Sequence, residues 1–326
     1  MKSVLLSRLW SAAITNQGAP VDSRGGCGTV REILGGRRVH MPILNRLVSY
    51  YETRGIGISA GLNPLRHANA PYVAFTWFIR DGESLTGGLG ISLQEIYFLE
   101  CLFDRYRPKS IFIIGNSWGW STLGLSLINP QARVVAIDSG HDQNSLEGLD
   151  FTNRVAHEEK LNLTVVKASS PHDVSGVIAK EFGGPIDFAF IDGYHTEHQV
   201  GLDFAAVRPS AAADAVYLFH DVLEFKLAPA IARAAASVDL PWFTLESTTS
   251  GMGILFDPAR QPDVAQAITP FRASDVAKPI MDREVYKAKH RHRLKWRRSF
   301  DKRVGRLKIL LMGKTPVRTV SNTPRR

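Results

Sequence analysis

The feature that most constrains the fold of this chain is an ordered alternation of short apolar runs and helical patterns. The apolar run 110–114 is followed by a turn that contains Gly115 and Gly119, and then by a helical pattern that ends before Pro130. Proline cannot continue a helix, and a second apolar run follows it and ends at Asp138. Strand, glycine turn, helix and strand in this order predict the start of a parallel sheet covered by helices.

The alternation continues to residue 256 and predicts the fold class. Ser92 and Glu95 have capping-box spacing, which predicts a helix before the first strand of the sheet. An α/β fold follows, with a Rossmann-like, doubly wound and mostly parallel sheet of about seven strands. The expected strands are Ser110–Ile114, Arg133–Ile137, Leu163–Lys167, Ile186–Ile191, Ala215–Phe219, Trp242–Glu246 and Gly253–Phe256.

The glycine turn has two further interpretations, and both fit less well. Residues 110–132 contain no charged side chain, which would suit a membrane helix, but Asn116, Pro130 and three glycines argue against one. Gly115 and Gly119 also depart from the G-x-G-x-x-G turn of dinucleotide sites, and their spacing suits a single nucleoside better. In such a sheet Asp138 is expected to face the ribose hydroxyls.

Positive charge is concentrated at the C-terminal end of the chain. The net charge is +9, and sixteen Lys and Arg against three acids place +13 from Met281 onward and −4 on the remaining residues. We therefore expect three segments: an N-terminal accessory or lid segment (1–85), a core (86–258) and a basic C-terminal extension (259–326). Three interpretations of the extension stay open: a solvated arm, a segment that binds an anionic membrane surface and, with less support, one that binds nucleic acid.

Cysteine content and the N-terminus bear on the compartment. Cys27 and Cys101 provide neither a disulfide framework nor a metal cluster, and a reducing cytosol fits this composition. Arg8 interrupts the first apolar run, which disfavours a signal peptide. The expected location is the cytoplasm, with peripheral membrane association through the basic extension as an option.

Polar side chains follow the fourth and fifth expected strands. Asp192 and His195 come after the fourth strand, and His220 and Asp221 come directly after the fifth. Ligands of parallel sheets bind outside the carboxyl ends of the strands. We therefore expect these four residues to converge with Asp138 on one crevice.

These motifs resemble those of class I S-adenosylmethionine-dependent methyltransferases. The resemblance is to a bacterial branch with an Asp-Gly-x-His signature at strand four, here Asp192 to His195, and a His-Asp pair at strand five, here His220 and Asp221. It covers about residues 90 to 257 and includes the turn into a terminal antiparallel strand. The branch contains sugar and natural-product O-methyltransferases, some of which use magnesium.

The resemblance also implies roles for individual residues. It implies that the turn from Ile114 to Ser121 cradles the methionine part of S-adenosylmethionine, that Asp138 binds its ribose and that Ser169 lies near its adenine. Two positions depart from the family pattern: Ile114 stands where many relatives carry an acid, and Arg208-Pro209-Ser210-Ala211 replaces the usual Pro-Gly-Gly turn. The expected cofactor-binding residues are Gly115, Asn116, Gly119, Ser121, Asp138, Ser169 and Asp192.

Methyl transfer to oxygen needs orientation first and proton removal second. His195 is the expected general base and Asp192 the second catalytic residue, with Asp192 and Asp221 as ligands of Mg²⁺, a hard cation that takes oxygen donors. The nitrogen of His220 suits softer metals. The alternatives are that the carboxylates bond backbone amides and that His195 is structural.

The function that these patterns favour is O-methylation of a hydroxylated small molecule or saccharide by S-adenosylmethionine, with metal assistance and a histidine base as further expectations. One alternative is an RNA-modifying methyltransferase that uses the basic extension. Another is a non-catalytic binding module with a methyltransferase-like fold.

Overall fold

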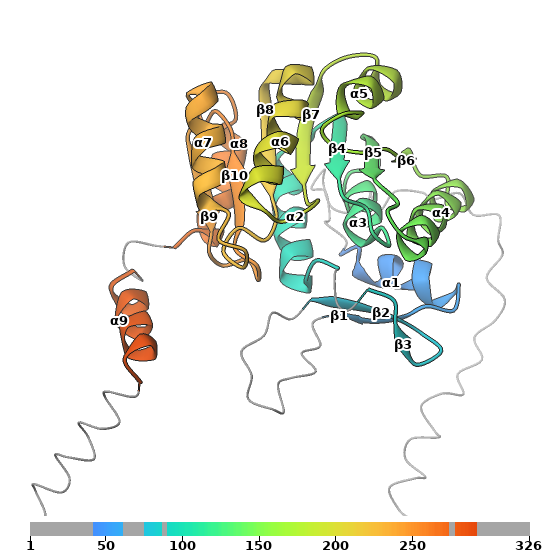
Figure 1. Cartoon of the computed structure of the whole chain (residues 1–326), viewed down its shortest axis with the longest axis horizontal. Coiled ribbons are helices and arrows are strands. Elements are labelled where there is room, and N and C mark those ends of the chain that lie inside the picture. Colours follow the sequence, from blue (N-terminus) through green and yellow to red (C-terminus); the bar gives the residue numbers. More distant parts are fainter. Residues whose placement is uncertain (1–41, 61–74, 87–89, 274–277, 292–326) are drawn as a thin grey trace, which may run out of the picture. The chain divides into compact units, whose positions relative to one another are not determined.

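The centre of the structure is a seven-stranded sheet of order β6-β5-β4-β7-β8-β10-β9. The computed structural model describes residues 42–60, 75–86, 90–273 and 278–291. Strands β4 to β8 run parallel, and β10 is antiparallel to both its neighbours (Figure 1). The predicted fold class is therefore confirmed. The strands are β4 (Ser110–Ile114), β5 (Arg133–Asp138), β6 (Leu163–Lys167), β7 (Ile186–Ile191), β8 (Ala211–Phe219), β9 (Trp242–Leu245) and β10 (Met252–Leu255).

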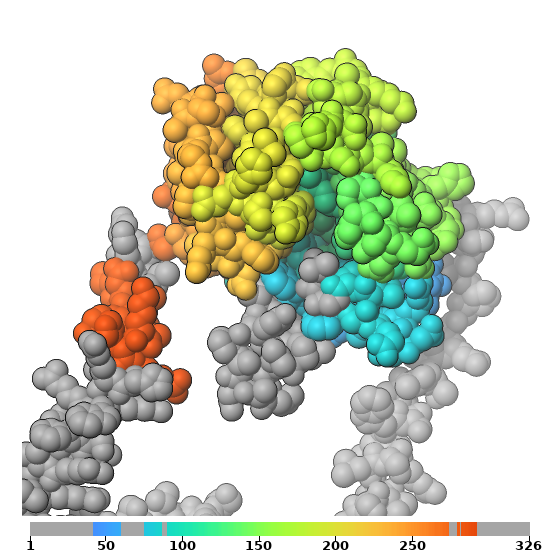
Figure 2. Space-filling model, viewed as in Figure 1, coloured from blue at the N-terminus to red at the C-terminus, as the bar shows by residue number. Residues whose placement is uncertain are grey.

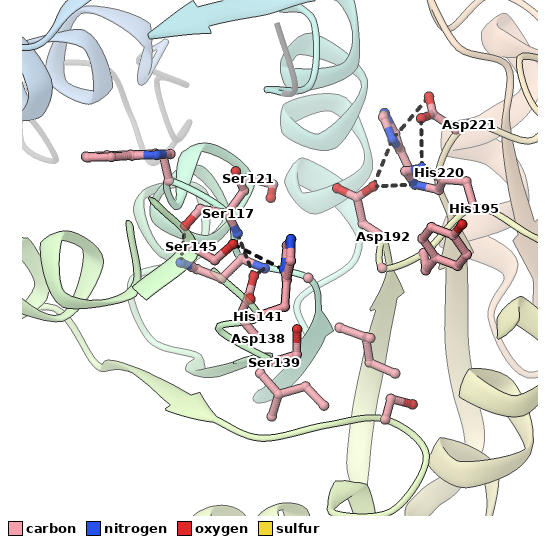
Figure 3. Close-up of a pocket in the computed structure, with 18 of the residues that line it drawn as sticks. Ser117, Ser121, Asp138, Ser139, His141, Ser145, Asp192, His195, His220 and Asp221 are labelled. Carbon is pink, nitrogen blue, oxygen red and sulfur yellow. Dashed lines mark hydrogen bonds and ion pairs between the residues drawn. The ribbon is translucent and has the colours of Figure 1, made fainter. Parts of the chain in front are cut away.

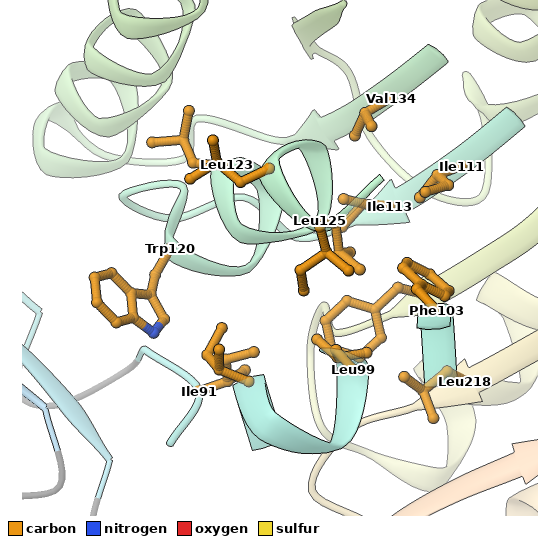
Figure 4. Packing of buried hydrophobic residues seen from close by; sticks show 14 of the residues in the cluster. Ile91, Leu99, Phe103, Ile111, Ile113, Trp120, Leu123, Leu125, Val134 and Leu218 are labelled. Carbon is orange, nitrogen blue, oxygen red and sulfur yellow. The ribbon is translucent and has the colours of Figure 1, made fainter. Parts of the chain in front are cut away.

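Helices cover both faces of this sheet because successive residues of its strands point to opposite sides. On β4, Ile111 and Ile113 belong to one hydrophobic cluster, whereas Phe112 and Ile114 belong to the other. Figure 4 shows the first cluster, in which Leu125 packs near the strand. The helices of this part are α2 (Leu93–Arg105), α3 (Trp120–Ile128), α4 (Gln143–Glu158), α5 (Val174–Phe182), α6 (Glu197–Val207), α7 (Ala228–Val238) and α8 (Pro262–Ile268).

Local sequence sets the ends of two helices as predicted. Ser92 caps α2 through its side chain, which accepts from the Glu95 N–H, while the Glu95 carboxylate accepts from the Ser92 N–H. Helix α3 ends at Ile128, before Asn129-Pro130. The predicted capping box and helix end are thus confirmed, and both follow from local chemistry alone.

A small N-terminal layer packs on the first cluster. It consists of α1 (Leu44–Glu52) and the antiparallel strands β1 (Gly57–Ala60), β2 (Thr76–Arg80) and β3 (Glu83–Ser84). The buried Tyr51 of α1 donates a hydrogen bond to the carbonyl oxygen of Trp118 at 2.8 Å, and its ring lies 5.3 Å from that of Phe78. Side chains from before residue 86 therefore contribute to the core of the sheet domain.

The chain also contributes to the core beyond residue 258. Val264, Ile268 and Phe271 are buried in the first cluster, so α8 packs on the domain, and α9 (Lys278–Lys289) begins after it. The division into 1–85, 86–258 and 259–326 stays a prediction, and residues 292–326 of the basic extension lie outside the described residues. Across the described ranges, every helix is too short or too polar to span a bilayer.

Candidate functional site

A cavity of about 860 Å³ lies at the carboxyl ends of the central strands. Figure 2 shows the surface hollowed between the green and yellow parts of the chain, which both contribute to the cavity lining. Figure 3 shows its labelled residues in two groups, one around Asp138 and one around His220. The cavity brings together eight of the nine predicted site residues: Gly115, Asn116, Ser121, Asp138, Ser169, Asp192, His195 and Asp221.

The ninth residue, Gly119, shapes the turn from outside the lining. It is the N-cap of α3 with a φ of +78°, and an added Cβ would lie 2.2 Å from Thr152 Oγ1. Gly115 has a φ of +98°, and its added Cβ would lie 2.0 Å from the carbonyl oxygen of Asp192. Glycine at Gly115 is required because the ends of β4 and β7 meet there.

Asp138 holds the glycine turn in place. Its Oδ2 accepts hydrogen bonds from the N–H groups of Asn116 at 3.1 Å and Ser117 at 2.9 Å, and its Oδ1 accepts from Gly140 at 2.9 Å. A carboxylate has about four acceptor positions, so the carboxylate keeps the capacity to accept a further hydrogen bond from a ligand. This structural role was not part of the sequence-based prediction.

Asp203 on α6 is a site residue that the sequence analysis missed. Its Oδ1 accepts from Ser170 Oγ at 2.5 Å and from Gln199 Nε2 at 2.6 Å, and its Oδ2 has no hydrogen-bond partner among the described residues. The side chain is 1% exposed, and burial raises the pKa of Asp203 despite these two donors. An acid inside the apolar run 200–207 was the signal in the sequence.

The second group centres on the buried side chain of His220. Its Nδ1 lies 2.9 Å from Asp192 Oδ1 and 3.3 Å from Asp221 Oδ1, and its Nε2 lies 3.3 Å from Glu95 Oε2. Burial opposes a charge on His220, but the facing carboxylates of Asp192 and Glu95 outweigh burial and raise its pKa well above the usual value. His220 is therefore held between carboxylates on both sides of its ring.

Glu95 is the second residue that the sequence analysis missed as part of the site. It is fully buried on α2, and its Oε1 accepts from the Ser250 N–H at 2.9 Å and from Ser250 Oγ at 2.5 Å. Burial would raise the pKa of Glu95, but His220 and these donors lower it to about 2. Sequence reasoning identified Glu95 only as a helix cap, because its partners lie more than 120 residues away.

His195 lies between the two predicted metal ligands. Its Nε2 is 3.3 Å from Asp192 Oδ1, and its Nδ1 is 3.5 Å from Asp221 Oδ2. The ring also stacks on Phe225 with centroids 4.9 Å apart and planes 24° apart. Burial lowers the pKa of His195, but Asp192 and Asp221 outweigh it and raise that pKa. Two carboxylates and one aromatic ring thus fix the orientation of this imidazole.

Three donor atoms in this group fit a divalent cation. His220 Nδ1 lies 2.9 Å from Asp192 Oδ1 and 3.3 Å from Asp221 Oδ1, and neither His220 Nδ1 nor Asp221 Oδ1 has a well-oriented hydrogen-bond partner among the described residues. Ligand atoms of Asp192, His195 and His220 also lie within 4.8 Å of one another. Glu95 faces the other ring nitrogen of His220, which is the arrangement that orients metal-bound histidines. The two carboxylates suit the predicted Mg²⁺, whereas the nitrogen donor suits transition metals.

Comparison with known proteins gives one family match. Residues 112–222 match the model of a family described as a methyltransferase domain. The match runs from within β4 to the turn after β8 and contains Asp138, Asp192, His195, His220 and Asp221, whereas Glu95, Glu224 and Phe225 lie outside it. No curated protein matches the chain.

Solved structures provide distant likenesses. A methyltransferase from Geobacter sulfurreducens is 16% identical, with a TM-score of 0.43, over 67% of this chain and 90% of that one. An O-methyltransferase from Bacillus cereus, solved in complex with SAH, is 16% identical, with a TM-score of 0.45, over 70% and 95%. The O-methyltransferase TomG from Streptomyces achromogenes, involved in tomaymycin synthesis and solved with SAM, is 13% identical, with a TM-score of 0.43, over 70% and 93%.

Proposed function

We propose that this chain, whose residues 112–222 match the model of a methyltransferase domain, is an S-adenosylmethionine-dependent O-methyltransferase acting on a hydroxylated small molecule or saccharide. One observation carries the proposal. A single cavity joins the glycine turn and Asp138 to an imidazole, His195, that two carboxylates hold in place.

The first group of cavity residues would hold the cofactor. S-adenosylmethionine, when bound, supplies a methyl group made electrophilic by the sulfonium. Gly115 lets the turn pack closely against the end of β7, Asp138 can accept a further hydrogen bond from a ribose hydroxyl, and Ser169 lines the same cavity, where it would lie near the adenine. The residues therefore fit the cofactor that the fold implies.

The second group would activate the acceptor. With the cofactor bound, the acceptor oxygen would bond to the methyl carbon as the carbon–sulfur bond breaks, with the thioether as the leaving group. The hydroxyl proton passes to the imidazole of His195, a step typically worth roughly 10²–10⁴-fold in rate. Phe225 and the carboxylate of Asp192 orient this ring, so the base needs no rearrangement.

A divalent cation would be held by Asp192, Asp221 and His220. It would lower the pKa of the acceptor hydroxyl and orient it. The two carboxylates support the predicted Mg²⁺, and the imidazole nitrogen of His220 adds Mn²⁺ or Zn²⁺ as candidates. To identify the ion, the protein is treated with a chelator, and methyl transfer is measured after each of these ions is added back separately.

Two measurements test the proposed function. Isothermal titration of the full chain with S-adenosylhomocysteine should show binding, and mass spectrometry of a panel of hydroxylated acceptors should show the gain of one methyl group. Absence of binding would sink the proposal. Binding without transfer to any acceptor would instead support the alternative of a non-catalytic module.

A second partner is proposed for the C-terminal extension: an anionic membrane surface at the cytoplasmic side. Helix α9 exposes Ile280, Val285 and Tyr286, each more than half accessible, and sixteen Lys and Arg lie from Met281 onward. Exposed apolar side chains on a basic segment favour a lipid surface over RNA, whose backbone offers them no partner.

Vesicle sedimentation tests this partner. We expect the full chain to sediment with phosphatidylserine-containing vesicles but not with phosphatidylcholine vesicles, and to be released by salt because exposed charges are screened. Val285→Glu should weaken the binding, whereas Glu52→Gln on α1 should leave it unchanged. Binding to single-stranded RNA with no binding to vesicles would favour the RNA-modifying alternative.

A further inference from the structure

The charge of the cavity lining constrains the acceptor. Six carboxylates line the cavity, and no Lys or Arg among the described residues does. Two of them, in Asp203 and Asp221, are buried and have an oxygen without a hydrogen-bond partner in the described part of the chain. The six acids are Asp138, Asp142, Asp192, Asp203, Asp221 and Glu224.

Glu224 is a lining acid whose carboxylate has no positively charged partner and no hydrogen-bond donor among the described residues. Asp138 bonds backbone N–H groups, and Asp192 and Asp221 face histidines. Glu224 is exposed at the mouth, and no ion pair or hydrogen bond of its side chain to another described residue occurs. Lys226 follows in the same turn but does not line the cavity. A negatively charged acceptor would therefore meet repulsion at the mouth.

The same rim carries exposed apolar side chains. Among residues 42–273 that the structure describes, four large apolar side chains are exposed; two of them, Tyr194 and Phe225, line the cavity, and a third, Leu223, lies in the same turn as Phe225. Tyr194 is 74% exposed and Phe225 is 50% exposed. A concentration of aromatic surface beside a polar centre is typical of a site that receives a ring.

The rim is also fixed in position. The N–H groups of Leu223 and Glu224 donate to the carbonyl oxygen of Ser250 at 3.1 and 3.3 Å, and the N–H of Phe225 donates to that of Asp221 at 3.0 Å. Phe225 stacks on His195. The backbone that carries Glu224 and the ring of Phe225 are thus held at a defined place beside the imidazole of His195.

We propose that the acceptor is an uncharged or positively charged hydroxylated molecule with a flat apolar ring face, and that Glu224, Tyr194 and Phe225 select it against carboxylated and phosphorylated molecules. The inference rests on the proposed methyltransferase function and names the substrate class of the same site. The cavity and the C-terminal extension then differ in the charge they favour: the cavity disfavours a polyanion, whereas the extension attracts one.

Three probes that differ only in charge test the proposal. Phenyl β-glucosaminide, phenyl β-glucoside and phenyl β-glucuronide share a phenyl ring and neighbouring hydroxyls and are cationic, neutral and anionic. Their dissociation constants are measured by titration into the full chain saturated with S-adenosylhomocysteine. We expect the glucuronide to bind about fivefold more weakly than the other two, as a partly screened charge at the mouth implies.

Two variants assign the effect to the rim. Glu224→Gln should reduce the difference between the cationic and anionic probes about threefold, and the matched control Glu52→Gln, an exposed acid on α1, should not change it. Phe225→Leu should weaken all three probes about fivefold, because it removes the ring but keeps an apolar side chain.

The outcomes separate this inference from the proposed function. Equal or tighter binding of the glucuronide, an unchanged charge preference in Glu224→Gln, or no binding of any of the three probes would each overturn the inference. Loss of S-adenosylhomocysteine binding would instead count against the methyltransferase function itself, because that ligand is titrated first and alone.

Discussion

Two strand ends of this protein carry the same kind of residue and use it differently. Asp138 at the end of β5 accepts three hydrogen bonds from backbone N–H groups, whereas Asp221 at the end of β8 has a buried oxygen with no donor among the described residues. An acid at a strand end therefore does not have one role. Satisfied backbone bonds indicate a structural role, and an unpaired buried oxygen indicates a position that is kept for a ligand.

The largest expected effect concerns the ligand side of this comparison. His195→Ala should lower kcat by roughly 10²–10⁴-fold, because it removes the proposed base. S-adenosylhomocysteine affinity, measured by titration, should change little, because the glycine turn and Asp138, not His195, are the proposed cofactor-binding residues. His198→Ala, an exposed histidine on α6 outside the cavity lining, is the control and should keep its activity.

The comparison itself is tested by the same substitution at both acids. Asp138→Asn should lower the free energy of unfolding by about 2 kcal/mol, because an amide nitrogen would then face a backbone N–H. Asp221→Asn should cost less than about 1 kcal/mol, since Oδ1 of this buried carboxylate accepts no hydrogen bond from the described residues and asparagine tolerates the φ of +57°.

Urea unfolding of both variants provides the measurement. Both should lose methyl transfer, so activity alone does not separate them. Equal destabilisation by the two substitutions would break the distinction between a structural and a ligand-facing carboxylate.

The smallest effect concerns Asp203, in which one carboxylate oxygen accepts hydrogen bonds and the other has no donor among the described residues. Burial raises the pKa of Asp203 in the folded state, so its ionisation opposes folding as the pH rises from its usual pKa of 3.8 through the folded value. Below 3.8 the group is protonated in both states and this cost vanishes. The stability of Asp203→Asn relative to the natural chain should therefore improve between pH 3 and pH 7.

Chemical unfolding at several pH values checks this expectation. Asp173→Asn replaces an exposed acid at the start of α5 that accepts from the Ser169 N–H, and this control should be less stable than the natural chain because it weakens that hydrogen bond. A pH-independent difference for Asp203→Asn would show that both of its oxygens are satisfied in solution.

The sequence by itself determined the sheet and its ligand-facing edge. The apolar runs, Pro130 and the capping box act within a few residues, so they predicted strands and helix ends without knowledge of partners. The rule that parallel strands present their carboxyl ends together then placed Asp192 and His195 in the cavity with Asp138.

Only the tertiary structure decided what each polar group faces. Glu95 meets His220 across 125 positions in sequence, and Asp203 on α6 meets Ser170 in the loop between β6 and α5. Hydrogen bonds and burial depend on distances between elements, which local patterns do not contain. The structure thus placed Gly119 outside the cavity lining and Asp203 in it, with Glu95 behind His220. It also gave Asp138 and Asp221 their different environments.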